Sequence, residues 1–130
     1  MDNTGSKTEM LRMKRWAVVG ASPDRSRYSY RIFNLLCEQG YEVYAVNPNY
    51  DKIDGKRCYS GLGELPAIPD VVCMVVNPKI GKKIVEETLR LGIKHIWFQP
   101  GSYDDEIIEF AGKNGISYVK GCVLLELGNG

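Results

Sequence analysis

A short loop after an apolar run holds the residues best suited to binding an anion. Gly20-Ala21-Ser22 follows the run Trp16–Val19, and Arg25 and Arg27 lie a few residues later. Glycine allows a tight turn that leaves backbone amides free to face a phosphate at the start of the next helix. Ser22 adds a hydroxyl donor, and the two arginines add positive charge. The loop therefore predicts a phosphate or pyrophosphate site, with simple solvation of the arginines as the alternative.

The end of the next apolar run distinguishes between nucleotide ligands. Tyr41–Val46 is followed by Asn47-Pro48, where an NAD site of the β-α-β type has an Asp or Glu that binds the ribose. The preceding loop also lacks the G-x-G-x-x-G pattern. A carboxylate would repel a ribose that carries a phosphate, whereas a neutral amide would not. The pattern favours a nucleotide with a phosphorylated ribose, such as coenzyme A or NADP.

Two further strand ends complete the predicted rim of the site. Asn77-Pro78 follows the run Val71–Val76, and Gln99-Pro100-Gly101 follows the run that begins at Ile96. Ligands of open parallel sheets bind outside the carboxyl ends of the strands, so these segments should converge with the glycine loop. None of them offers a carboxylate pair or a nucleophile beside a base. We therefore expect binding through backbone and amide groups, and the sequence leans against an enzyme.

The elements that position this rim alternate between apolar runs and helical patterns. Strands are expected at 16–19, 41–46, 71–76, 96–99 and 116–120, with a short edge strand near 57–59. Three helices join them, with Asn77 and Ser102 as N-caps of the second and third. The inner faces of the first two are marked by Ile32, Leu35, Leu36 and Gln39, and by Ile80, Ile84, Thr88 and Leu91. This order predicts an α/β, Rossmann-like, doubly wound parallel sheet of about five strands in a single domain.

Length and composition narrow the class of protein. The chain has 130 residues, 44% of them hydrophobic and 25% charged, so we expect one domain over residues 12–130 preceded by a flexible segment at 1–11. The net charge of +1 argues against a nucleic-acid or membrane-surface partner. No apolar run approaches the ~20 residues of a membrane span. Because residues 1–10 also lack a signal-peptide pattern, we expect a cytoplasmic protein.

Cysteine and histidine positions do not predict a metal centre. Cys37, Cys58, Cys73 and Cys122 are widely spaced, without a C-x-x-C pair, and His95 is the single histidine. We expect four reduced and mostly packed thiols, with the role of Cys122, just past a strand end, left open. His95 is expected at a sheet end without a catalytic partner. The segment GASPD does not fit the G-x-S-x-G pattern of a hydrolase nucleophile.

Five motifs, in order along the chain, resemble those of the small single-domain CoA-binding proteins. They are VVGAS, YEVYAVNPNYDKIDGKRCYSGLGELP, DVVCMVVNPK, HIWFQPGS and GCVLLEL. These proteins are similar to the N-terminal CoA-binding domain of the succinyl-CoA synthetase α subunit and of the ADP-forming acyl-CoA synthetases. The match covers roughly residues 12–127. The resemblance implies a Rossmann-like domain that holds the nucleotide end of coenzyme A.

The resemblance also implies a role for individual residues. It places Gly20, Ala21 and Ser22 at the pyrophosphate, and Arg27, followed by Tyr28 as is frequent in the family, where it neutralises phosphate charge. The other residues are Asn47, Pro48 and Tyr50 around the adenosine, Val76, Asn77 and Pro78 on the opposite wall, and Gln99, Pro100 and Gly101 towards the pantetheine arm. Tyr28 could stack on the adenine or cover the first helix, and Arg31 is expected to be solvated. The chain departs from the family at Ser29, where glycine is frequent, and at Val76 and Asn77, where some members have Arg or Pro.

Several functions remain open from the sequence. The first is a non-catalytic CoA- or acyl-CoA-binding module that acts as a carrier, a sensor or a partner subunit. The second is an enzyme, either an NADP-dependent oxidoreductase or a CoA-ligase subunit completed by another chain. A third is a scaffold without a ligand that serves as an interaction protein. Pairing with itself or with another protein is left open.

Overall fold

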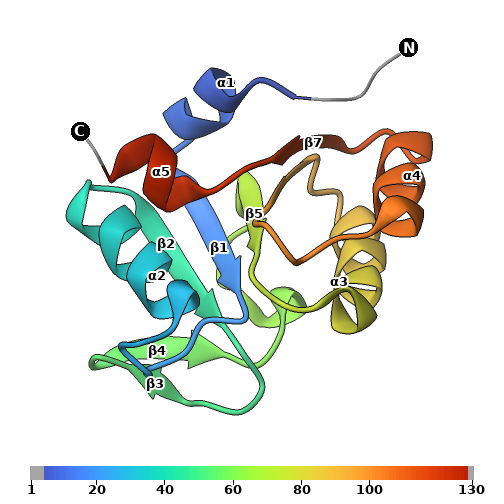
Figure 1. The fold of residues 1–130 in the computed structure, drawn as a ribbon. Helices are drawn as coiled ribbons and strands as arrows, with labels where there is room; N and C mark the ends of the chain where they lie inside the picture. Colours follow the sequence, from blue (N-terminus) through green and yellow to red (C-terminus); the bar gives the residue numbers. More distant parts are fainter. Residues whose placement is uncertain (1–4, 129–130) are drawn as a thin grey trace.

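A seven-stranded sheet runs through the computed structural model, which describes residues 5–128 (Figure 1). The strands are β1 (Arg15–Val19), β2 (Glu42–Val46), β3 (Lys52–Ile53), β4 (Lys56–Tyr59), β5 (Val71–Met74), β6 (His95–Phe98) and β7 (Ser117–Lys120). Their order across the sheet is β3-β4-β2-β1-β5-β6-β7, and all pairs are parallel except β3 with β4. The predicted Rossmann-like α/β class is confirmed.

The direction of strand addition reverses at β1. Val19 at its end pairs with Val46 of β2 on one side and with Met74 of β5 on the other. The chain therefore builds outward from β1 to β3 and β4, and then returns to add β5, β6 and β7 on the opposite side. Such a reversal leaves a crevice at the carboxyl ends of the two strands where the order changes. Here these strands are β1 and β5.

Helices cover both faces of the sheet because successive strand residues point to opposite sides. Trp16 and Val18 pack under α1 (Lys7–Arg12), α2 (Tyr28–Glu38) and α5 (Val123–Leu127). Ala17 and Val19 pack on the other face, under α3 (Pro78–Arg90) and α4 (Asp105–Lys113). A short 3-10 helix, η1 (Leu62–Glu64), closes the connection between β4 and β5. Within residues 5–128 no helix is long and apolar enough to cross a membrane.

The sheet has more strands than the five or so predicted. The expected edge strand near residues 57–59 is present as β4, but β3 pairs with it as the outermost strand. The two are joined by Asp54 and Gly55, whose φ angles are 50° and 78°. An Asp-Gly pair with positive φ at both residues is typical of a tight hairpin turn. A strand of two residues carries too little alternation to be recognised in the sequence.

Three details of the predicted helices are wrong. Ser102 does not cap α4, because Asp104 accepts the hydrogen bond from the Ile107 N–H at 2.9 Å. In α3 the buried residues are Gly81, Val85 and Thr88, whereas Ile80 is 50% exposed. Thr88 is buried as predicted, and Ile84 and Leu91 pack partly buried against the core. Only Ile80 is wrong, because Gly81 takes the inner position of the first turn beside the Ser102 carbonyl. In α2, Gln39 is likewise exposed.

Two short helices were not predicted. Helix α1 lies in the segment expected to be flexible, where Ser6 caps it and Met10 is 1% exposed against the sheet. Helix α5 follows β7 and packs beside α2. Residues 1–4 of the predicted flexible segment and residues 129–130 of the predicted domain lie outside the described residues.

Candidate functional site

The turn after β1 requires glycine for two reasons. Gly20 has a φ of 97°, a conformation that L side chains rarely adopt. A Cβ atom at this position would also lie 2.5 Å from the Val75 carbonyl oxygen and 2.8 Å from Val76 Cγ1. The Gly20 N–H donates to the Val46 carbonyl at 2.9 Å. The glycine therefore lets the loop fit tightly between the ends of β2 and β5.

The residues after Gly20 form a loop that is held by its own hydrogen bonds. Ala21 and Ser22 are buried, and Ser22 Oγ accepts from the Asp24 N–H at 3.1 Å. The Asp24 carboxylate accepts from the Ser26 N–H at 3.0 Å and from Ser26 Oγ at 2.7 Å. These two bonds hold the pKa of Asp24 below its usual value. The loop is thus preformed at the start of α2.

Arg25 and Arg27 lie at the outer edge of this loop. Their side chains are 79% and 71% exposed, and each has one distant carboxylate partner. Arg25 Nη2 is 3.9 Å from Asp54, and Arg27 Nε is 3.7 Å from Asp24. Exposed pairs of this kind contribute about 0–1 kcal/mol. Both arginines can therefore turn towards an anion at small cost.

Asn47 joins the loop to the end of β2. Its Nδ2 donates to the Ala21 carbonyl at 2.8 Å, and its Oδ1 accepts from the Asn49 N–H at 2.9 Å. An aspartate could replace the acceptor but not the donor. The amide predicted to face a ribose thus has protein partners at both ends, and it positions the loop.

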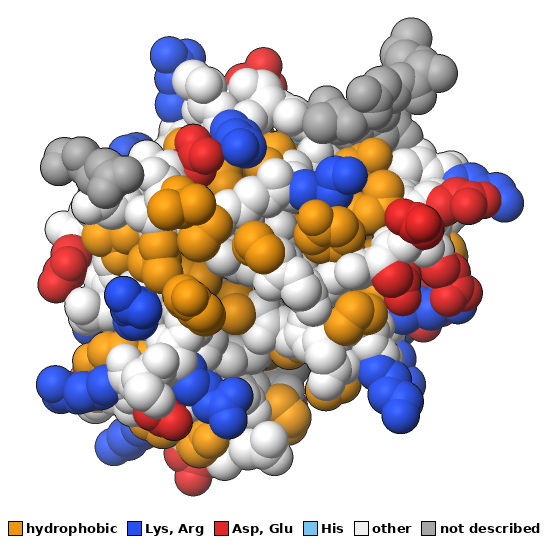
Figure 2. Space-filling model, viewed as in Figure 1, with side chains coloured by type: hydrophobic (Ala, Val, Ile, Leu, Met, Phe, Trp, Pro, Cys, Tyr) orange, Lys and Arg blue, Asp and Glu red, His pale blue; other side chains and the backbone are white. Residues whose placement is uncertain are grey.

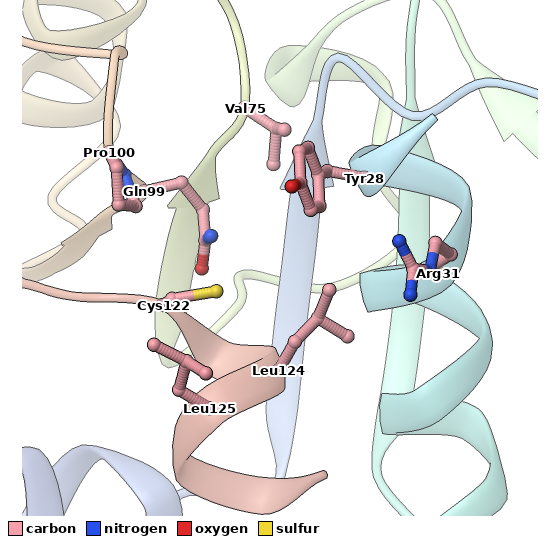
Figure 3. Close-up of a pocket in the computed structure, with 8 residues that line it drawn as sticks. All are labelled: Tyr28, Arg31, Val75, Gln99, Pro100, Cys122, Leu124 and Leu125. Atoms are coloured by element: carbon pink, nitrogen blue, oxygen red, sulfur yellow. The ribbon is translucent and has the colours of Figure 1, made fainter. Parts of the chain in front are cut away.

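A cleft of about 480 Å³ opens at the carboxyl ends of β5 and β6, between α2 and α5 (Figure 3). Its walls are mostly apolar and come from four segments of the chain. They are formed by Tyr28, Arg31, Val75, Gln99, Pro100, Cys122, Leu124 and Leu125. Figure 2 shows hydrophobic side chains gathered over α5 on this face of the molecule. The volume is within the usual range for a small-molecule site.

Gln99 is the polar side chain most deeply set in the cleft. It is 4% exposed, and its Oε1 accepts from the Val123 N–H at 2.8 Å, which fixes the start of α5. Its backbone carbonyl accepts from Ser102 Oγ at 2.7 Å. Its Nε2 has no hydrogen-bond partner among residues 5–128 and is directed into the cleft (Figure 3). The cleft therefore presents an amide donor on an otherwise apolar wall.

A second, polar groove lies beside β4. Its volume is about 450 Å³, and it is lined by Pro48, Tyr50, Asp51, Lys52, Arg57, Cys58, Tyr59, Ser60 and Glu64. The Arg57 guanidinium lies 4.7 Å from the centre of the Tyr59 ring. Lys52 and Arg57 give one side of the groove positive charge. This groove contains two of the residues predicted to surround an adenosine.

The structure thus distributes the predicted residues over several places. Tyr28, Gln99 and Pro100 line the cleft, and Pro48 and Tyr50 line the groove. Asn77 caps α3 by accepting from the Ile80 N–H at 3.1 Å, with Pro78 as the first helical residue. Gly101 follows with a φ of 86°. Val76 lies against Gly20 at the end of β5, and Ser29 is buried in the first turn of α2.

Part of the cleft was missed in the sequence. Leu124 and Leu125 belong to the GCVLLEL motif, but no site was assigned to them. Arg31 is exposed, as expected, and it also lines the cleft, with its guanidinium 5.6 Å from the centre of the Tyr28 ring. The available signal was the apolar run Val123–Leu125 directly after a predicted strand. Cys122, whose role was left open, is a half-buried thiol on the same wall.

Comparisons with known proteins find similarity over most of the chain. The model of a family described as CoA binding domain matches residues 14–128. An ADP-forming acetate–CoA ligase of Archaeoglobus fulgidus is 31% identical over 113 residues, which cover 79% of this chain and 16% of that enzyme. The uncharacterized protein YneT of Bacillus subtilis is 29% identical over 109 residues, covering 84% of this chain and 81% of YneT.

A solved structure with higher identity has the same fold. It is a conserved hypothetical protein from Pyrococcus furiosus, with a TM-score of 0.83 and 42% identity, covering 87% of this chain and 98% of that one. The chain thus spans nearly the whole of this small protein, but only 16% of the ligase above.

Proposed function

Since the chain belongs to the CoA binding domain family, we propose that it binds coenzyme A or an acyl-CoA and has no catalytic role of its own. The observation that carries the proposal is the position of the cleft. It opens at the carboxyl ends of β5 and β6, and its wall residue Val75 abuts Gly20 at the β1–β5 reversal, which is the ligand position of open parallel sheets. A module of this kind would serve as a carrier, a sensor or a partner subunit.

Coenzyme A has a charged nucleotide end and a largely aliphatic pantetheine arm, and the site has a polar loop and an apolar cleft that match them. The pyrophosphate would lie at the Gly20-Ala21-Ser22 loop, at the start of α2, with Arg25 and Arg27 neutralising its charge. The pantetheine arm carries amide groups on an aliphatic chain. It suits the apolar cleft, where Gln99 Nε2 would donate to one of its carbonyls.

The adenosine end would extend towards the polar groove. Tyr50 is 38% exposed there, and Lys52 and Arg57 supply positive charge for the ribose phosphate. Asn47 would act by holding the loop in place. This assignment keeps the predicted residues of the adenosine pocket together at the β2 and β4 ends.

A second candidate function is a subunit of a CoA ligase completed by another chain. It is favoured by the relative from Pyrococcus furiosus named acetate–CoA ligase (ADP-forming) II subunit alpha, which is 29% identical over 114 residues and of which this chain covers 25%. In that case the bound CoA would be presented to a partner that supplies the catalytic groups.

Thermal unfolding with a ligand panel tests the proposal. A ligand that binds only the folded chain stabilises it by about 2.7 kcal/mol at a hundred times its Kd. We expect CoA and acetyl-CoA to raise Tm most, dephospho-CoA less and NAD least. Stabilisation by NADP or NAD without stabilisation by CoA would show that the proposal is wrong. Calorimetric titration of the same panel gives the affinities.

A further inference from the structure

Cys122 is the thiol of this chain that opens onto the apolar cleft. Figure 3 shows its sulfur directed into the cleft, next to the Gln99 carboxamide and Leu124. The other three thiols lie elsewhere. Cys73 is fully buried in β5, Cys37 lies in α2 outside the cleft lining, and Cys58 lies beside the polar groove.

A second observation shows that the same space suits a ligand. Gln99 is 4% exposed, and its Oε1 accepts from the Val123 N–H. Its Nε2 has no partner among the described residues and faces the open cleft, where it can donate to a ligand. The pantetheine arm would supply a carbonyl acceptor, and it ends in a thiol. A carbonyl placed on Gln99 leaves that thiol near the wall that Cys122 forms.

We propose that Cys122 forms a mixed disulfide with the thiol of bound CoA, by exchange with a CoA-containing disulfide. The inference rests on the proposed CoA binding. The Cys122 thiolate attacks the sulfur of the bound CoA half, the incoming disulfide breaks, and the Cys122–CoA disulfide forms. The other half leaves as a thiolate and takes up the proton that Cys122 lost. Cys122 is oxidised and the leaving thiol is reduced, so no further oxidant is needed.

The remaining thiols do not compete with Cys122 in this exchange. Burial raises the pKa of the Cys73 thiol far above its ordinary value, and it also raises the pKa values of Cys37 and Cys58. Because the thiolate is the attacking species, these raised pKa values disfavour attack by the other three thiols. Cys73, fully buried in β5, is the least able of them to displace CoA from Cys122.

Intact-mass spectrometry tests the proposal on the full chain. The reduced protein, freed of reductant, is incubated with CoA disulfide or, at the same concentration, with glutathione disulfide. We expect one CoA per chain, mapped to Cys122 and removed by dithiothreitol. It should form at least about tenfold faster than the glutathione adduct, because binding of the nucleotide end holds the disulfide beside the thiol. Cys122→Ser and Cys122→Ala should form no adduct, and Cys37→Ser should behave as the wild type.

Three results would overturn the proposal: an adduct on Cys37 or Cys58, equal rates with the two disulfides, or no adduct. A parallel thermal-shift measurement of the wild type with reduced CoA and dithiothreitol separates this failure from that of the proposed function. Stabilisation by reduced CoA without an adduct removes only the covalent step. Absence of stabilisation removes CoA binding itself.

Discussion

The two halves of the candidate site are built in different ways. The cleft side is fixed by two hydrogen bonds. Gln99 Oε1 accepts from the Val123 N–H at 2.8 Å in a buried bond, and Trp97 Nε1 donates to the Gly121 carbonyl at 2.9 Å in a partly buried one. The phosphate side combines a preformed backbone loop with exposed cations. Arg25 and Arg27 make weak ion pairs, and the Arg25 guanidinium also lies 5.7 Å from the centre of the Tyr30 ring. Shape is thus set by the fold, and charge is added by side chains that the fold does not need. Substitutions that change the shape of the site should therefore alter the stability of the fold, whereas substitutions of the exposed charged side chains should alter ligand binding alone.

The largest effect is expected at Gly20, where the fold and the site meet. Gly20→Ala would place a Cβ 2.5 Å from the Val75 carbonyl oxygen at a φ of 97°. The backbone strain and the overlap together should lower the free energy of unfolding by about 2–5 kcal/mol. Urea denaturation measures this loss.

Gly40→Ala is the matched control for that change. Gly40 has a φ of 88°, but nothing lies within 4 Å of the position of its Cβ. It should cost only the strain, about 1–2 kcal/mol. Equal losses for the two variants would mean that the β5 end moves aside without difficulty, and the proposed tight fit at the β1–β5 reversal would then be wrong.

A smaller effect is expected at Asn47, which tests how the loop is positioned. Asn47→Asp keeps the acceptor for Asn49 but removes the donor to the Ala21 carbonyl and sets a carboxylate against it. We expect about 1–2 kcal/mol less stability and CoA affinity about tenfold lower, which corresponds to about 1.4 kcal/mol. Calorimetric titration and urea denaturation give the two quantities.

Asn49→Asp adds the same charge nearby, while the Asn49 contact used here is made by its backbone N–H. It should leave both the stability and the CoA affinity close to those of the wild type. If Asn47→Asp instead keeps its stability and gains affinity for NAD, the residue selects the ribose directly. Asn47 would then face the ribose, as the sequence predicts, and would not act mainly by positioning the loop.

The sequence predicted the central parallel strands and where they end, because both depend on local patterns. The run Val71–Met74 is buried on both faces, as a continuous apolar run in a parallel sheet predicts. The cleft wall could not be predicted from the sequence, because α5 has only five residues and its start is fixed by the distant side chain of Gln99. The neutral charge of Asn47 can be read from the sequence, but its contact with the Ala21 carbonyl joins it to another loop and exists only in the folded chain.

The smallest effect is expected at the exposed cations. Arg27 precedes α2, and its side chain makes no capping hydrogen bond, so Arg27→Ala should leave the free energy of unfolding unchanged within about 0.5 kcal/mol. The loss of one exposed charge beside a pyrophosphate should lower CoA affinity about three- to tenfold, the size of an interaction of about 1 kcal/mol. Because salt screens exposed charges, the difference in CoA affinity from the wild type should shrink as ionic strength rises.

Arg90→Ala, on α3 and the opposite face of the sheet, controls for a general change in net charge. An affinity that stays the same in Arg27→Ala would mean that the backbone amides hold the phosphates without this cation, and the division of the site into a shaped half and a charged half would then fail at this residue.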